Sequence, residues 1–281
     1  MPYRGHKIVL VTPAGRKRYM ELLFPQILKY QHAGVVDEYH FWKNTVNTDD
    51  IAFMTQTARL HPDFVRIAEL PRKVPVNGNL SIYDFFKRCI ETNTVYVRFD
   101  DDIVVLDTVD AFKKFLDFRI DNNKYFMVYA NILNNAMCTY ILQHNGRLST
   151  DKGIAQYLCM DEVGWKSGEF AAGVHDQVLK QLELDGLSHF RYPGSWPLLQ
   201  HERVSINCLS WLGENLNAAC KGLVGEDEED EISVQIPKKK GLFNVIFGEY
   251  CVVHYAFFTQ RLYLDEHGYE DKYRQLQLKS I

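Results

Sequence analysis

The sequence predicts an α/β protein of one domain, with a mainly parallel central sheet flanked by helices and a smaller antiparallel part. Short apolar runs of strand type alternate with amphipathic segments of helical period through the first hundred residues. Successive strand and helix units of this kind form parallel sheets with right-handed crossovers. A hydrophobic content of 46% in 281 residues supplies a sizeable core.

The first strand and helix unit contains a candidate ligand-binding turn. An apolar strand run at residues 7–11 breaks at the Pro- and Gly-containing segment 12–16, and an amphipathic helix follows through residues 19–30. In α/β proteins, such a turn at the carboxyl end of the first strand often forms a nucleotide-binding crevice, and an ordinary connecting turn is the alternative. Neither GxGxxG nor GxxxxGK[ST] occurs, so the sequence supports neither a dinucleotide fold nor a P-loop.

The remaining elements follow from the same patterns. An aromatic turn at residues 192–197 is suited either to stacking on sugar rings or to surface packing. Further strands are predicted at residues 35–42, 64–68, 94–99, 125–130, 204–213 and 250–258, further helices at 49–60, 82–90, 176–184 and 269–278, and irregular segments at 71–79 and 131–150.

Three consecutive aspartates stand between two apolar runs, at residues 94–99 and 103–106. Adjacent carboxylates repel one another, so a positive partner is expected to hold them. Side chains two residues apart on a strand share a face, so Asp100 and Asp102 are placed to converge on one cation while Asp101 points elsewhere. Mg²⁺ and Mn²⁺ take carboxylate oxygens and leave positions for phosphate. The alternative is a solvated acidic turn.

Two more features suggest chemistry. An acidic run at residues 226–231 follows Gly225. Such a run is usually a solvated helix start, where acids face the helix dipole, but one of its carboxylates is also a candidate general base. His254 lies inside the apolar run 250–258. A buried structural histidine is the usual explanation, and a metal ligand is the alternative.

Charge and cysteine content limit the partners and the location. The formal net charge of −4 argues against nucleic acid as a partner. Six cysteines show no metal-binding spacing and mostly lie in apolar runs, which predicts reduced core residues in a cytoplasmic protein. No apolar run approaches the roughly 18 residues of a membrane span, and no signal-peptide core is visible at the N-terminus.

Taken together, these segments resemble the GT-A nucleotide-sugar glycosyltransferases. The resemblance rests on the strand that ends in Asp100-Asp101-Asp102, the glycine before Glu226-Asp227-Glu228, and the strand histidine about 25 residues later. It extends over nearly the whole chain. Residues 11–16, 42–45 and 254–261 are also similar to segments of poorly characterised glycosyltransferase-like proteins of bacteria and large viruses.

The resemblance implies a role for each matching residue. Asp100 would contact the donor ribose or the metal, with Asp101 beside it, and Asp102 and His254 would ligate Mn²⁺ or Mg²⁺. Residues 1–107 would bind the nucleotide sugar, and residues 108–281 would bind the acceptor and carry catalysis. The nucleotide pocket would be lined by Thr12, Pro13, Ala14, Arg16, Asn44 and Thr45, and the base would be Asp227 or Glu228, with Asp176 behind Gly173 as the alternative.

The sequence therefore predicts a metal-dependent glycosyltransferase that moves a sugar from a nucleoside-diphosphate sugar to a hydroxyl of a glycan or glycolipid. The metal would neutralise the leaving diphosphate, and a carboxylate would accept the acceptor's proton if configuration inverts. Two alternatives stay open. One is a nucleotidyl or phosphoryl-transfer enzyme, which also combines an α/β sheet with metal-binding carboxylates. The other is a non-catalytic carbohydrate-binding protein that keeps a degenerate transferase fold.

Overall fold

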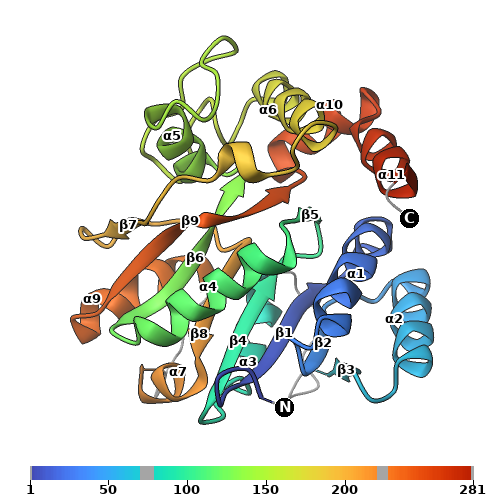
Figure 1. Cartoon of the computed structure of the whole chain (residues 1–281), viewed down its shortest axis with the longest axis vertical. Helices are drawn as coiled ribbons and strands as arrows, with labels where there is room; N and C mark the ends of the chain where they lie inside the picture. The colour runs from blue at the N-terminus through green and yellow to red at the C-terminus, as the bar shows by residue number, and fades with distance from the viewer. Residues whose placement is uncertain (1, 70–78, 220–226, 280–281) are drawn as a thin grey trace.

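The computed structural model describes residues 2–69, 79–219 and 227–279, and a single large sheet lies at its centre (Figure 1). Both the first and the second half of the chain supply strands to this sheet. The strands described are β1 (Lys7–Ala14), β2 (Glu38–Lys43), β3 (Val65–Ala68), β4 (Thr94–Phe99), β5 (Ile103–Leu106), β6 (Tyr125–Leu133), β7 (Ser195–Leu198), β8 (Cys208–Leu212) and β9 (Phe243–His254).

The strand order is β3-β2-β1-β4-β8-β6-β9-β5, and β7 also pairs with β9. Strands β3, β2, β1 and β4 are mutually parallel, and so are β6 and β9. Strand β8 lies antiparallel between β4 and β6, while β5 and β7 run antiparallel to β9. Six of the nine strands in the described residues therefore share one direction. The predicted fold class, a mainly parallel sheet with a smaller antiparallel part, is confirmed.

Helices cover the sheet on both faces and at its edges (Figure 1). Helix α1 packs against β5, α4 packs against β9, and α6, α10 and α11 pack against one another. The helices are α1 (Lys17–His32), α2 (Thr48–Leu60), α3 (Asn79–Phe86), α4 (Val109–Asp121), α5 (Ala136–His144), α6 (Gly168–Leu182), α7 (Gly213–Ala219), α8 (Glu228–Asp230), α9 (Ile236–Lys240), α10 (Phe258–Glu266) and α11 (Tyr269–Lys279), with a 3-10 turn η1 (Ser188–Phe190) and a π-helical segment η2 (Glu231–Gln235).

Several predicted boundaries were wrong, and helices α4, α5, α7, α9 and α10 were not predicted. The predicted irregular segment 71–79 lies outside the described residues, apart from Asn79, where α3 begins. Helix α5 begins inside the asparagine-rich segment predicted as irregular, because the Asn135 side chain accepts a hydrogen bond from the Cys138 N–H at 3.3 Å and caps the helix. Helix α6 starts at Gly168, well before residue 176, because Ser167 caps it. Strand β8 starts only at Cys208, and β9 ends at His254, where the predicted strand continued into α10.

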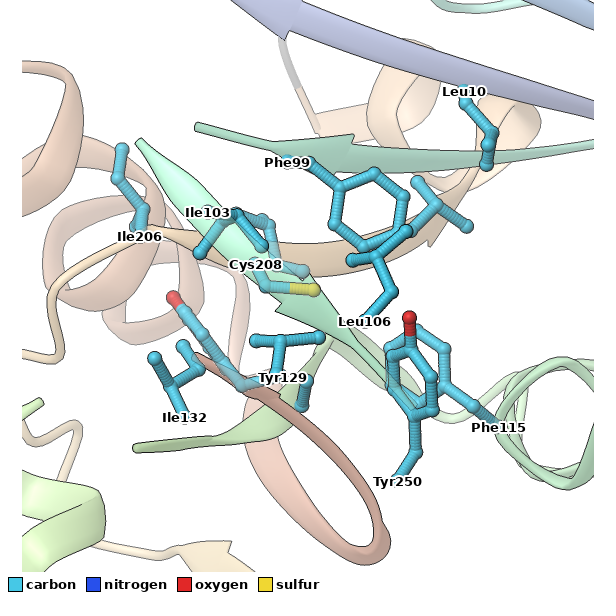
Figure 2. Packing of buried hydrophobic residues seen from close by; sticks show 14 of the residues in the cluster. Leu10, Phe99, Ile103, Leu106, Phe115, Tyr129, Ile132, Ile206, Cys208 and Tyr250 are labelled. Atoms are coloured by element: carbon cyan, nitrogen blue, oxygen red, sulfur yellow. The ribbon is translucent and has the colours of Figure 1, made fainter. Parts of the chain in front are cut away.

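The core lies between the sheet and helices α1 and α4. Figure 2 shows Phe99, Ile103 and Leu106 packed beside Phe115 of α4 and Tyr250 of β9. The rings of Phe115 and Tyr250 stack with centroids 4.9 Å apart. This packing fixes β4 and the start of β5, and therefore the aspartate triplet between them, against a rigid apolar layer.

The cysteine prediction is confirmed for the described residues, in which five cysteines are buried and unpaired with one another. In the same described ranges, no helix combines the length and apolarity that crossing a bilayer requires.

Candidate functional site

A cleft of about 850 Å³ opens at the edge of the sheet where β1, β2, β4 and β9 end and the antiparallel β8 begins. Its volume falls in the range of small-molecule sites. The loops that follow parallel strands meet at this edge, which is the usual ligand position in open α/β sheets. Candidate site residues from five segments that are distant in the sequence line this cleft: Pro13, Arg16, Asn44, Asp100, Asp101, Asp102, Asp227, Glu228 and His254.

Asp101 fixes the turn after β1. Its carboxylate accepts hydrogen bonds from the Gly15 N–H and from Arg16 Nε, both at 2.9 Å, and from a second nitrogen of the Arg16 guanidinium. Gly15 lies so close to the backbone that an added Cβ would stand 3.2 Å from the Asn44 carbonyl oxygen. Asp101 therefore serves the predicted nucleotide pocket by holding Arg16 in position.

Asp102 is the carboxylate around which the positive side chains of the cleft gather. Its Oδ2 lies 2.9 Å from an Arg16 nitrogen, 3.1 Å from an Arg261 nitrogen and 3.6 Å from His254 Nε2. Burial alone would raise the pKa of Asp102, but Arg16, His254 and Arg261 hold that pKa well below its usual range. The carboxylate is thus ionised, and its buried Oδ1 has no hydrogen-bond partner.

The backbone of Asn134 orients the His254 ring. Its Nδ1 lies 3.0 Å from the carbonyl oxygen of Asn134, so Nδ1 is assigned as the donor and Nε2 faces Asp102. This orientation directs Nε2 at the Asp102 carboxylate, so the two side chains would be able to share a cation. The orphaned Asp102 Oδ1 and this nitrogen are suitable donors for a hard divalent cation. Within the described ranges, however, no group of three or more His, Cys, Asp or Glu side chains is arranged to hold a metal ion.

Asp100, the other predicted metal ligand, is engaged elsewhere. Arg98 donates to its Oδ1 from two nitrogens, at 3.0 and 2.7 Å, and the Asn207 amide donates to its Oδ2 at 3.0 Å. The same Arg98 lies 3.2 Å from both carboxylate oxygens of Glu228. A cation at Asp102 and His254 would therefore need water or substrate oxygens as its remaining ligands, which is usual for Mg²⁺.

The acidic run is bound by arginines. Burial raises the pKa of Glu228 to about 7, although Arg98 acts in the opposite direction. Asp227 caps α8 by accepting a hydrogen bond from the Asp230 N–H, and it pairs with Arg203 at 2.8 Å. Glu229 pairs with Arg203 at 2.7 Å. Gly225 and Glu226, which belonged to the predicted motif, lie outside the described residues.

Four predicted site residues do not line the cleft. Thr12 and Ala14 are buried within β1, and Thr45 donates a hydrogen bond to Asp50 at 2.9 Å. Asp176 does not stand at a helix start as predicted, because α6 begins eight residues earlier, at Gly168. Its carboxylate accepts a hydrogen bond from the Tyr269 hydroxyl at 2.8 Å. The aromatic turn at residues 192–197 also lies outside the cleft lining.

Sequence reasoning missed three arginines and an aromatic wall. Arg98 was visible as the one charge within the apolar strand 94–99, and a buried charge requires partners. Arg203 carried no local signal, and Arg261 ended the similar segment 254–261 but was given no role, since its partner Asp102 lies far away in the chain. The wall consists of Trp165, Phe257 and Phe258.

The Glu228 pKa predicts a pH-dependent effect of Glu228→Gln. A group whose pKa rises from 4.5 to about 7 on folding weakens the folded state as pH increases between those values. Glutamine removes this loss, and Arg98 keeps Asp100 as a partner. The variant should match the parent near pH 4.5 and gain about 2–3 kcal/mol by pH 8, measured by urea unfolding. The exposed Glu162→Gln is the control, and an advantage that is constant with pH would contradict this assignment.

Comparisons with known proteins find only distant structural similarities. No family model and no curated protein matches the chain. A solved structure of 4-diphosphocytidyl-2C-methyl-D-erythritol synthase from Anaerococcus prevotii is 10% identical, covers 95% of this chain and 99% of its own, and has a TM-score of 0.46. CMP:2-keto-3-deoxy-manno-octonic acid synthetase complexed with CTP is 10% identical, with coverages of 98% and 100% and a TM-score of 0.46. Mannose-1-phosphate geranyltransferase from Thermus thermophilus is 11% identical, with coverages of 88% and 75% and a TM-score of 0.43.

These similarities correct the main functional prediction. The names describe two synthases of cytidine-nucleotide compounds and one transferase named for a sugar phosphate, and none of the three is a glycosyltransferase. The prediction of a glycosyltransferase is therefore wrong by this comparison. The alternative prediction, a nucleotidyl or phosphoryl-transfer enzyme, agrees better with the names of these structures. At these identities the likeness itself concerns the fold alone.

Proposed function

We propose that this chain transfers a nucleotidyl group from a nucleoside triphosphate to a phosphate monoester and releases pyrophosphate. The observation that carries the proposal is that every carboxylate lining the cleft, within the described residues, is already paired with an arginine. Even Glu228, whose pKa is raised, has both carboxylate oxygens 3.2 Å from Arg98, so no free carboxylate in that lining is left to take a proton from a hydroxyl acceptor. A phosphate monoester needs no such base, because its second pKa is about 6 and it is ionised at neutral pH.

The positive groups are placed for phosphate. Arg16 and Arg261 approach Asp102 from two segments, and their side chains are 35% and 26% exposed, so they remain accessible from the cleft. Guanidinium groups bind phosphate oxygens in a planar, two-pronged geometry. Asp102 keeps the two like charges together before the nucleotide arrives. Because the two guanidinium groups are already in position, less reorganisation of the site is needed in the transition state.

The reaction is a displacement at the α-phosphorus. An oxygen of the acceptor phosphate forms a bond to the α-phosphorus of the triphosphate, and the bond from that phosphorus to the oxygen bridging to the β-phosphate breaks. The electron pair leaves with pyrophosphate. Arg16 would bind the negative charge that develops on the leaving group, and Arg261 would bind the acceptor phosphate. Asp100, Glu228 and Arg98 would hold the floor of the cleft in place.

A divalent cation completes the proposal. Asp102 and His254 would hold Mg²⁺ or Mn²⁺, since Asp102 Oδ1 lacks a partner and His254 Nε2 faces the same carboxylate. When bound, the cation would neutralise phosphate charge as a Lewis acid.

The test is product analysis. The purified protein is incubated with each nucleoside triphosphate, a mixture of phosphate monoesters, and Mg²⁺, Mn²⁺ or EDTA, and released pyrophosphate is measured. We expect cation-dependent pyrophosphate release with one nucleotide. That nucleotide at 100 times its Kd should stabilise the protein by about 2.7 kcal/mol in thermal unfolding. Release of a nucleoside diphosphate from a nucleotide sugar, with no pyrophosphate from any triphosphate, would refute the proposal.

A further inference from the structure

The cleft has one apolar wall that phosphate chemistry does not explain. The Trp165 ring lies with its centroid 6.1 Å from that of Phe257 and 5.2 Å from that of Phe258, edge to face in the second pair. Phe258 is 72% exposed, and Met160 on the same lining is 50% exposed. Large apolar side chains left this open to water in a cleft indicate an apolar ligand surface.

Helix α10 carries this wall outward and joins it to the phosphate-binding groups. Residues three and four apart lie on one helix face, so Phe258 stands next to both Arg261 and Leu262. Arg261 reaches Asp102, while Leu262 is 70% exposed and lies beyond the cleft lining. An apolar strip, made of Trp165, Phe258 and Leu262, therefore starts beside an anion-binding arginine and continues out of the cleft.

Buried hydrogen bonds fix the strip in place. Thr259 donates to the Trp165 carbonyl oxygen at 2.6 Å, which ties the first turn of α10 to the segment bearing the tryptophan. Gln260 is fully buried, accepts from the Phe257 N–H at 3.2 Å and donates to the Gly164 carbonyl oxygen at 3.2 Å. The exposed rings are thus held by an ordered support, so little conformational entropy is lost when a ligand binds to them.

We infer that the acceptor is a phosphate monoester of a long aliphatic chain, with its phosphate at Arg261 and its chain along the apolar strip. This rests on the proposed function. Phe258 and Leu262 offer no side-chain hydrogen-bonding group and Trp165 offers a single N–H donor, so the strip would leave most hydroxyls of a sugar body unsatisfied. A chain longer than the cleft also accounts for the continuation of the strip to Leu262. The product would be a nucleoside diphosphate joined to the lipid chain.

The binding of simple phosphate monoesters tests whether the site takes an aliphatic chain. Octyl phosphate, kept below its micelle-forming concentration, should bind the full-length protein roughly tenfold or more tightly than ethyl phosphate by calorimetry. Phe258→Ser and Leu262→Ser should each weaken octyl phosphate binding by about threefold to tenfold and leave ethyl phosphate binding unchanged. Leu199→Ser, at another exposed leucine (63%), is the matched control and should change neither.

The outcomes separate this inference from the proposed function. Equal affinity for octyl and ethyl phosphate, or tighter binding of glucose 1-phosphate than of octyl phosphate, overturns the aliphatic acceptor while pyrophosphate release still supports nucleotidyl transfer. A loss of octyl phosphate binding in Leu199→Ser equal to that in Leu262→Ser also overturns it. If no phosphate binds and no triphosphate yields pyrophosphate, both fail.

Discussion

Replacing Arg98 by methionine is expected to lower the free energy of unfolding by about 3–5 kcal/mol. The Arg98 side chain is only 3% exposed and pairs with Asp100 and Glu228. Methionine fills a similar volume but leaves the buried Glu228 and the partly buried Asp100 close together without a positive partner. Loss of one member of a buried ionic group is among the most destabilising single changes. Urea unfolding at pH 7.5 measures it.

Two further variants sharpen this experiment. Lys114→Met removes a surface pair with Glu249, in which the lysine side chain is 61% exposed, and should change stability by less than about 1 kcal/mol. Combining Arg98→Met with Asp100→Asn and Glu228→Gln removes all three charges together. This triple variant should recover most of the lost stability, because no uncompensated charge stays buried. If Arg98→Met unfolds like the parent, the three residues do not act as the ionic unit described above.

Replacing Asp102 by asparagine is expected to reduce kcat/KM for pyrophosphate release at least about 100-fold. Asparagine keeps the shape of the side chain but removes the charge that holds Arg16 and Arg261 together beside His254. The two guanidinium groups would then repel one another, and the candidate cation would lose its only ionised ligand. Steady-state pyrophosphate release, with unfolding temperature measured in parallel, tests this expectation.

Asp110→Asn provides the matched control, because Asp110 is 91% exposed at the start of α4 and is not part of the cleft lining. It should retain full activity. A folded Asp102→Asn protein with undiminished activity would remove Asp102 from the reaction.

How far the sequence predicted this structure depends on how local each signal is. The turn after β1 and the aspartate triplet were visible because proline, glycine and three adjacent carboxylates interrupt apolar runs. Their partners were not visible. Arg261 stands 159 residues from Asp102, and Glu228 stands 130 residues from Arg98, so only the folded chain brings them together.

The helix errors have a related cause. Asn135 was interpreted as part of an irregular segment, yet an asparagine before an apolar run is also a helix cap, and a single sequence does not decide between the two. Asp176 was predicted as the alternative general base because it follows Gly173 at an expected helix start. The helix in fact begins at Gly168, and its first turns were overlooked. The π-helical segment after α8 likewise has no pattern of its own in the sequence.

The place of β8 in the sheet affects how the protein is made. Strand β8 joins β4 to β6, yet it lies 109 residues after the end of β4, at Phe99 and Cys208. While the ribosome is still synthesising the chain, the facing edges of β4 and β6 have no partner and expose unpaired amide and carbonyl groups. Pairing over such a sequence distance is slow, and open strand edges promote association between nascent chains. The sheet, and with it the cleft, therefore cannot close until β8 has been synthesised.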